Sequence, residues 1–135
     1  SKRILAVDDT PDNLFLVQTL LEDDGYEVDL ADSGEDALMK VETRLPDLIL
    51  LDVMMPGIDG YEVVRRIRQN KSLYHIPILL ITAQRESRQA DDLTTEPDGF
   101  IRKPIDLDEL LEKVKMLLTS HHGTEPERDT ELSFG

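Results

Sequence analysis

Five short runs of largely apolar residues constrain the fold of this chain more than any other feature of its sequence. The runs that are apolar at every position include Leu48 to Leu51 and Ile78 to Ile81. Continuous apolar runs suit strands that are covered on both faces, as in a parallel sheet, whereas strict alternation suits a sheet with one wet face. The other three runs are Ile4 to Val7, Val28 to Ala31 and Phe100 to Ile101. We therefore expect five short strands in an α/β protein.

The segments between these runs have the period of amphipathic helices. Apolar positions recur at helical spacing at Leu14, Val17 and Leu21, and again at Gly60, Val63, Val64 and Ile67. Ser33 with Asp36, and Asp106 with Glu109, predict two further helix starts, because a side-chain oxygen at the first position can cap the helix. The last helix has the apolar stripe of a face packed on the sheet. Strands and helices alternate, which predicts one (βα)5 unit.

Two segments do not follow this pattern so clearly. Between Arg85 and Thr95 only Ala90 and Leu93 are apolar, so we expect any helix there to be weakly held. Residues 119–135 are mostly polar and contain Gly123 and Pro126. We expect one domain over residues 1–118, followed by a polar tail or linker that is disordered.

Composition excludes several classes of protein. The formal net charge is −14 with 15 Lys plus Arg, so a nucleic-acid backbone would repel this chain, and we expect no direct nucleic-acid binding. No apolar run is long enough to span a membrane or to form a secretory signal, so the expected location is the cytoplasm. The absence of cysteine removes disulfides, thiolate metal sites and thiol catalysis.

Reactive side chains follow four of the predicted strands. Asp8 and Asp9 follow the first, Asp52 the third, Thr82 the fourth and Lys103 the fifth. The carboxyl ends of parallel strands lie at one edge of the sheet, where open α/β proteins bind their ligands. A single aspartate at such a position would usually be a helix cap. Three carboxylates at one edge instead predict a common site.

The chemistry of these residue types predicts a magnesium-assisted phosphate site. Like charges held close together need a cation, and the oxygen ligands Asp8, Asp9 and Asp52 suit a hard ion such as Mg²⁺, with Mn²⁺ as a substitute. Lys103 and the Thr82 hydroxyl can then hold phosphoryl oxygens. An ionised Asp52 is a plausible nucleophile that needs no general base, and its attack on phosphorus would give an acyl phosphate.

These motifs closely resemble the receiver domain of response regulators in two-component signalling, and single-domain chemotaxis-type receivers in particular. The resemblance covers roughly Lys2 to Leu118 and includes Asp8-Asp9, Thr82-Ala83, Lys103-Pro104 and the loop LLDVMMPGIDGYEV from Leu50 to Val63. It implies a doubly wound, flavodoxin-like parallel sheet with strand order 2-1-3-4-5. It also implies a phosphorylation-controlled switch rather than an enzyme, with at most slow autophosphorylation and autodephosphorylation.

The resemblance assigns a role to each site residue. Asp52 is the implied phosphoacceptor, and its phosphoryl group comes from a histidine kinase or a histidine phosphotransfer protein. Asp9, Asp52 and the backbone carbonyl of Met54 are the implied direct ligands of Mg²⁺, and Asp8 acts through water. Lys103 pairs with the phosphate, and the Lys103–Pro104 peptide is cis. Thr82 and Phe100 are the implied switch pair, whose movement changes a surface that contacts a downstream protein or a linked output domain.

Three alternatives remain at this point. A haloacid-dehalogenase-like phosphatase uses similar groups but usually has a second aspartate two residues after its nucleophile, where this chain has Met54. A flavodoxin-like cofactor binder needs a phosphate loop after the first strand, where Asp8 and Asp9 would repel phosphate. A receiver-shaped interaction module that is never phosphorylated would not need Thr82 and Lys103 beside the three aspartates.

Overall fold

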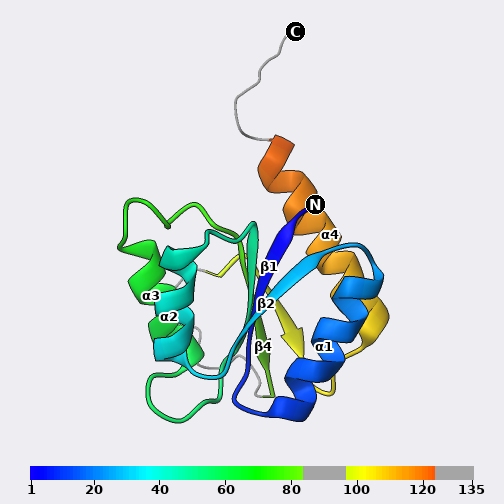
Figure 1. Cartoon of the computed structure of the whole chain (residues 1–135), viewed down its shortest axis with the longest axis horizontal. Coiled ribbons are helices and arrows are strands. Elements are labelled where there is room, and N and C mark those ends of the chain that lie inside the picture. The colour runs from blue at the N-terminus through cyan, green and yellow to red at the C-terminus, as the bar shows by residue number, and fades with distance from the viewer. Residues whose placement is uncertain (84–96, 124–135) are drawn as a thin grey trace, which may run out of the picture.

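The computed structural model describes residues 1–83 and 97–123, which form one parallel sheet flanked by helices (Figure 1). The strand order is β2-β1-β3-β4-β5, as the resemblance implied. The strands are β1 (Arg3–Val7), β2 (Glu27–Ala31), β3 (Leu48–Asp52), β4 (Ile78–Thr82) and β5 (Gly99–Arg102). Each of the five predicted strands is therefore present, and each lies within one residue of its expected bounds.

Helices cover both faces of the sheet. They are α1 (Pro11–Asp23), α2 (Gly34–Thr43), α3 (Gly60–Arg68) and α4 (Leu107–Gly123). Figure 1 shows α2 and α3 on one side of the strands and α1 and α4 on the other. The segment from Arg85 to Thr95, where any helix was expected to be weakly held, lies outside the described residues. None of the helices that the structure describes has the length and apolar character needed to cross a bilayer.

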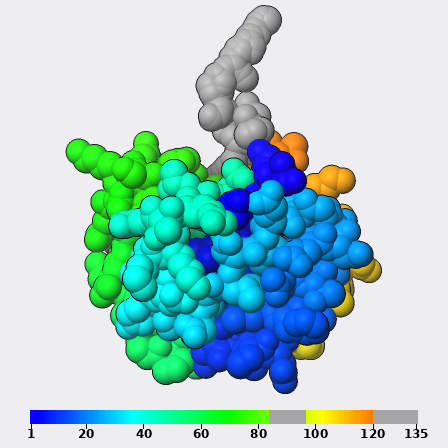
Figure 2. Space-filling view, in the orientation of Figure 1, coloured from blue at the N-terminus to red at the C-terminus, as the bar shows by residue number. Residues whose placement is uncertain are grey.

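The central strand β3 shows why an apolar run is continuous in this sheet. Ile49 and Leu51 of β3 belong to the apolar cluster under α2 and α3, whereas Leu48 and Leu50 belong to the cluster under α1 and α4. Alternate side chains of a strand point to opposite faces, so a strand covered on both sides needs apolar residues throughout. In the space-filling view, side chains of α1 and α2 occupy much of the visible face beside the β2 edge (Figure 2).

The two predicted helix caps are present, and the final helix is longer than expected. Ser33 Oγ accepts a hydrogen bond from the Asp36 amide at 3.0 Å. Asp106 Oδ1 accepts from the amides of Asp108 and Glu109 at 2.9 and 3.2 Å. Helix α4 continues to Gly123, so residues 119–123 are helical rather than part of a disordered tail. The first glycine after Leu118 is Gly123, and glycine is a common helix terminator. Residues 124–135 lie outside the described residues.

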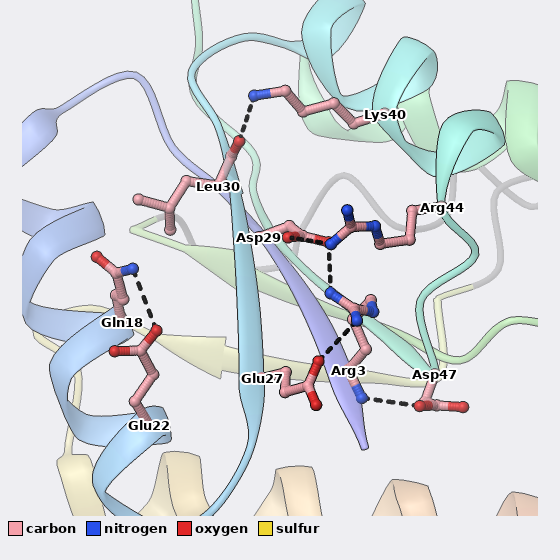
Figure 3. A network of polar contacts seen from close by, with 9 residues as sticks. All are labelled: Arg3, Gln18, Glu22, Glu27, Asp29, Leu30, Lys40, Arg44 and Asp47. Carbon is pink, nitrogen blue, oxygen red and sulfur yellow. Dashed lines mark hydrogen bonds and ion pairs between the residues drawn. The ribbon is translucent and has the colours of Figure 1, made fainter. Parts of the chain in front are cut away.

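A polar network ties the start of β1 to its neighbours, at the edge of the sheet opposite the predicted site (Figure 3). The Arg3 guanidinium pairs with Glu27 at 2.6 Å and with Asp29 at 3.3 Å, and Arg44 lies 3.7 Å from Asp29. The Arg3 amide donates to the Asp47 carboxylate at 2.8 Å. Partly exposed ion pairs contribute little to stability. We therefore expect this network to contribute little to the free energy of unfolding.

A second polar cluster joins α3, the loop after it and the start of β5. The Arg68 guanidinium donates to the carbonyls of Tyr74 and Ile76 at 2.8 and 2.9 Å and pairs with Asp98 at 2.8 Å. The same Asp98 oxygen accepts the Ile78 amide at 2.8 Å. Asp98 therefore connects three elements just before β5, the strand that leads to Lys103.

We expect the Asp98→Ala substitution to lower the free energy of unfolding by about 1–3 kcal/mol, because it leaves the Ile78 amide and the Arg68 guanidinium without this acceptor. Urea denaturation of the native chain and the variant measures the difference. The Asp47→Ala variant, which removes an exposed acceptor at the other polar cluster, is the control and should lose less. Equal losses in the two variants would contradict the importance of the Asp98 contacts.

Candidate functional site

The structure brings the three predicted carboxylates together at the carboxyl edge of the sheet. Oxygen atoms of Asp8, Asp9 and Asp52 all lie within 4.8 Å of one another. This follows from strand register, because Val7 pairs with Leu51, which places Asp8, directly after β1, beside Asp52, the last residue of β3. The Asp8 amide also donates to the Ala31 carbonyl at 3.1 Å, so the chain is held in place directly after β1.

Asp52 is the most buried of the three carboxylates. Its side chain is 2% exposed, and the Lys103 ammonium lies 3.0 Å from Oδ1. Although this ion pair is close, Oδ1 accepts no well-aligned hydrogen bond from the described residues. Burial raises the pKa of Asp52, the adjacent Lys103 ammonium acts to lower it, and the charges of Asp8 and Asp9 raise it further. The site therefore holds an under-compensated anion that a cation would stabilise.

The two other carboxylates have different surroundings. Asp8 is buried, with Oδ1 accepting the Thr10 amide at 2.9 Å and Oδ2 accepting the Asn13 side-chain amide at 3.2 Å. Asp9 is exposed and, within the described residues, has no hydrogen-bond partner on its carboxylate. Sequence reasoning did not identify Asn13. Its position in the first turn of α1, five residues after Asp8, was the available signal.

Thr82, the last residue of β4, and Lys103, the residue directly after β5, complete the rim of the site. Thr82 ends β4 and is 4% exposed, and its carbonyl accepts the Lys103 amide at 2.8 Å. The Lys103–Pro104 peptide is cis, as the resemblance implied. Lys103 is thus anchored by its backbone to β4 and by its ammonium to Asp52. The five residues predicted from strand ends converge on one edge of the sheet.

Met54 follows β3 and Phe100 lies within β5, and the roles that the resemblance assigned to them stay predictions. Met54 lies in the loop between β3 and α3 with its side chain 57% exposed, which is compatible with a role for its backbone alone. Phe100 is half-buried against the cluster under α2 and α3, and its carbonyl accepts the Lys113 ammonium at 2.7 Å. This is the position of a packed side chain.

Gly60 lets the start of α3 approach the backbone of Asp52. A Cβ at this position would lie 2.7 Å from the Asp52 carbonyl oxygen and 2.8 Å from the Val53 Cα. The Gly60 amide donates to the Val53 carbonyl at 2.9 Å, so the helix and the strand end are held in direct contact. Sequence reasoning assigned Gly60 only to a helical face and missed this close approach.

We expect Gly60→Ala to lower the free energy of unfolding by about 1–3 kcal/mol, because the new methyl group would clash with backbone rather than with a movable side chain. Thermal or urea denaturation measures this loss. The comparison variant is Gly99→Ala, whose Cβ would meet only side-chain carbons at 3.2 Å or more. A Gly60→Ala variant as stable as the native chain would show that the two backbones separate easily.

The donor set fits Mg²⁺. All three candidate ligands are carboxylates, and hard cations such as Mg²⁺ prefer oxygen ligands. The buried Oδ1 of Asp52, which accepts no well-aligned hydrogen bond from the described residues, is suited to bind a metal ion. Among the described residues this group contains no histidine, which disfavours a transition-metal site. The arrangement therefore suits an ion that binds carboxylates on one side and phosphate on the other.

The comparisons with known proteins identify the family. The response regulator receiver domain matches residues 4–115. The alkaline phosphatase synthesis transcriptional regulatory protein PhoP of Bacillus subtilis is 43% identical over 119 residues, which are 87% of this chain and 49% of that protein. This chain thus spans about half the length of that relative.

Solved structures give the same family. A receiver domain protein of the CheY-like type from Methanospirillum hungatei has a TM-score of 0.82 at 30% identity, covering 90% of this chain and 96% of that one. The response regulator TrrA of Thermotoga maritima, solved in complex with Mg²⁺ and BeF, has a TM-score of 0.78 at 42% identity, covering 87% and 99% of the two chains. With its sheet order and its aspartate cluster, this chain belongs to the response regulator receiver domain family.

Proposed function

We propose that this chain is a phosphorylation-dependent signalling switch in which Asp52 accepts a phosphoryl group from a histidine kinase or a histidine phosphotransfer protein. The observation that carries the proposal is the burial of Asp52 between two carboxylates and the Lys103 ammonium, which lies 3.0 Å away. A structural aspartate needs no such surroundings. A nucleophile that must receive a charged group beside a cation does need such surroundings.

The chemistry follows from the groups at this edge. An oxygen of ionised Asp52 attacks phosphorus and forms the new P–O bond, while the P–N bond to the donor histidine breaks and its electron pair stays on the imidazole. Lys103, already beside Asp52, is placed to pair with a phosphoryl oxygen. Thr82 lies at the end of β4, and we propose that its hydroxyl donates a hydrogen bond to a second phosphoryl oxygen.

The metal ligands that we propose are Asp9, Asp52 and the Met54 backbone carbonyl, with Asp8 acting through water. Bound Mg²⁺, or Mn²⁺ in its place, would neutralise negative charge on the phosphoryl oxygens during transfer. The support in this chain is the clustering of the three carboxylates and the under-compensated Asp52. The Mg²⁺ and BeF complex of TrrA gives support from a relative.

The output that we propose is a protein contact. Phosphorylation would draw in Thr82 and Phe100 and change the neighbouring surface, so the phosphorylated state favours one of two pre-existing conformations. The partner is a downstream protein or a covalently linked output domain. A net charge of −14 argues against direct contact of these residues with nucleic acid, and a cytoplasmic location fits a kinase partner.

Two other functions fit less well. A haloacid-dehalogenase-like phosphatase would need a general acid-base carboxylate two residues after the nucleophile, and that position is Met54, with an exposed thioether side chain. We therefore expect slow loss of the phosphoryl group rather than turnover. A phosphorylation-independent interaction module would not require the Lys103 contact with a buried Asp52.

The test is the intact mass of the native chain after incubation with acetyl phosphate, with Mg²⁺ or with an excess of chelator. We expect one phosphoryl adduct with Mg²⁺ and none with chelator. If neither sample carries an adduct and calorimetry detects no Mg²⁺ binding, the interaction module is the better account. Continuous release of inorganic phosphate, with the protein unmodified at every time point, would instead identify a phosphatase.

A further inference from the structure

Asp8 is held by two neutral hydrogen-bond donors from the segment that starts α1. The Thr10 amide donates to Oδ1 at 2.9 Å, and the Asn13 side-chain amide donates to Oδ2 at 3.2 Å. Asp8 is 7% exposed, so few water molecules can replace either donor. Its two carboxylate oxygens thus have separate partners within one turn of the chain. A carboxylate with both oxygens bound in this way has little freedom to rotate.

The other two carboxylates of the cluster are held differently. Asp52 faces the Lys103 ammonium at 3.0 Å, and Asp9 has no hydrogen-bond partner among the described residues. Two neutral donors orient Asp8 without supplying a positive charge that would compete with a metal ion. Each carboxylate oxygen has more than one lone pair, so a hydrogen bond from Asn13 leaves capacity to accept another from a metal-bound water molecule.

We propose that Asn13 is a positioning residue that holds the Asp8 carboxylate in the orientation required for Mg²⁺ binding. This inference rests on the proposed function, because it concerns the metal on which phosphorylation depends. Partners that orient metal-site carboxylates typically change metal affinity by about 10-fold to 100-fold when they are removed. Asp8 acts through water in our account, so we expect the lower end of that range.

Two variants of α1 separate this role from simple helix stability. Asn13→Leu keeps the approximate size of the side chain and removes its amide. Gln18→Leu makes the same kind of change further along the helix, where the Gln18 amide donates to the exposed Glu22 carboxylate at 3.3 Å (Figure 3). Both variants lose one hydrogen bond from an amide to a carboxylate, but only the first loses a contact with the cluster. The Asn13→Gln variant, which keeps an amide donor at the same position, tests for rescue.

The experiment measures the Mg²⁺ dissociation constant of all four chains by isothermal titration calorimetry, and their unfolding temperatures without metal. We expect about 10-fold weaker binding for Asn13→Leu, partial recovery for Asn13→Gln and no change for Gln18→Leu. The Mg²⁺ concentration that gives half of the maximal phosphorylation rate should rise with the dissociation constant, and excess Mg²⁺ should restore much of that rate.

The possible outcomes distinguish failure of the inference about Asn13 from failure of the proposed function on which it rests. If Asn13→Leu unfolds at a lower temperature yet binds Mg²⁺ as tightly as the native chain, Asn13 is a structural residue and the inference is wrong. Equal weakening in Asn13→Leu and Gln18→Leu would also overturn it, because the effect would then come from the helix as a whole. If the native chain itself binds no Mg²⁺, the proposed function is wrong, and the inference about Asn13 is wrong with it.

Discussion

We expect the Asp52→Asn variant to form no Mg²⁺-dependent phosphoryl adduct and to be more stable than the native chain at neutral pH. The carboxamide is not a nucleophile toward phosphorus, so acetyl phosphate should leave the mass of the variant unchanged. Stability should rise because the native carboxylate is 2% exposed and stands beside two others. Removing its charge removes the cost of burying that charge, although the attraction of Lys103 is lost with it.

The pH dependence of this effect has a definite sign. The pKa of Asp52 is raised in the folded state, chiefly by burial, so the folded chain keeps this proton after the unfolded chain has lost it. The free energy of unfolding therefore falls as the pH rises from the ordinary pKa of an aspartate to the raised value in the fold. Below this window Asp52 is protonated in both states and carries no such cost.

Urea denaturation of the native and Asp52→Asn chains, across mildly acidic to neutral pH and without metal, measures this difference. The stability gain of the variant should be largest at neutral pH and smallest in acid. Asp47→Asn is the control, because Asp47 is an exposed carboxylate that accepts the Arg3 amide at the opposite end of the sheet. An adduct on Asp52→Asn equal to that of the native chain would contradict the assignment of the phosphoacceptor.

We expect Lys103→Met to slow phosphorylation by about 100-fold at saturating Mg²⁺ and acetyl phosphate. Loss of one preorganised group that stabilises transition-state charge typically costs about 100-fold to 1,000-fold in rate. The methionine side chain keeps most of the length of lysine but removes the ammonium that lies 3.0 Å from Asp52. Without metal, the variant should also be less stable at neutral pH, because the buried Asp52 carboxylate loses its nearest cation.

Two comparisons make the Lys103 result interpretable. Lys40→Met removes an ammonium of α2 that donates to the Leu30 carbonyl on the edge strand β2, and this variant should phosphorylate like the native chain. The double variant Asp52→Asn with Lys103→Met tests the coupling, since Lys103→Met should destabilise the Asp52→Asn chain less than it destabilises the native chain. Phosphorylation of Lys103→Met at the native rate would remove this lysine from the proposed mechanism.

The main features of the fold and site could be predicted from the sequence because buried strands appear in it as apolar runs and the site residues stand at the ends of those runs. The runs Leu48 to Leu51 and Ile78 to Ile81 are apolar throughout because their strands are covered on both faces. Asp8 directly follows β1 and Asp52 ends β3, and these strands are parallel neighbours, so the proximity of the two residues required only the sheet topology. Both predictions use features that can be read within a few neighbouring residues, namely the pattern of apolar residues and the position at which an apolar run ends.

The features that were missed depend on contacts between particular atoms, and the spacing of apolar residues along the sequence does not reveal such contacts. Gly60 fits an amphipathic helix, and only the distance of 2.7 Å between a would-be Cβ and the Asp52 carbonyl shows why a glycine stands there. Asn13 looks like one more polar residue of a helix start until its amide is seen to reach Asp8. Helix α4 continues past Leu118, after which a polar tail was expected, because a polar sequence alone does not stop a helix.

The central claim is that Asp52 itself carries the phosphoryl group, and the most direct test is to locate the modified residue. The native chain is treated with acetyl phosphate and Mg²⁺, then reduced with borohydride, which converts an aspartyl phosphate to homoserine, and its peptides are sequenced by tandem mass spectrometry. Our account predicts homoserine at position 52, with Asp8 and Asp9 unchanged. Homoserine at either of those positions, or at none, would contradict it.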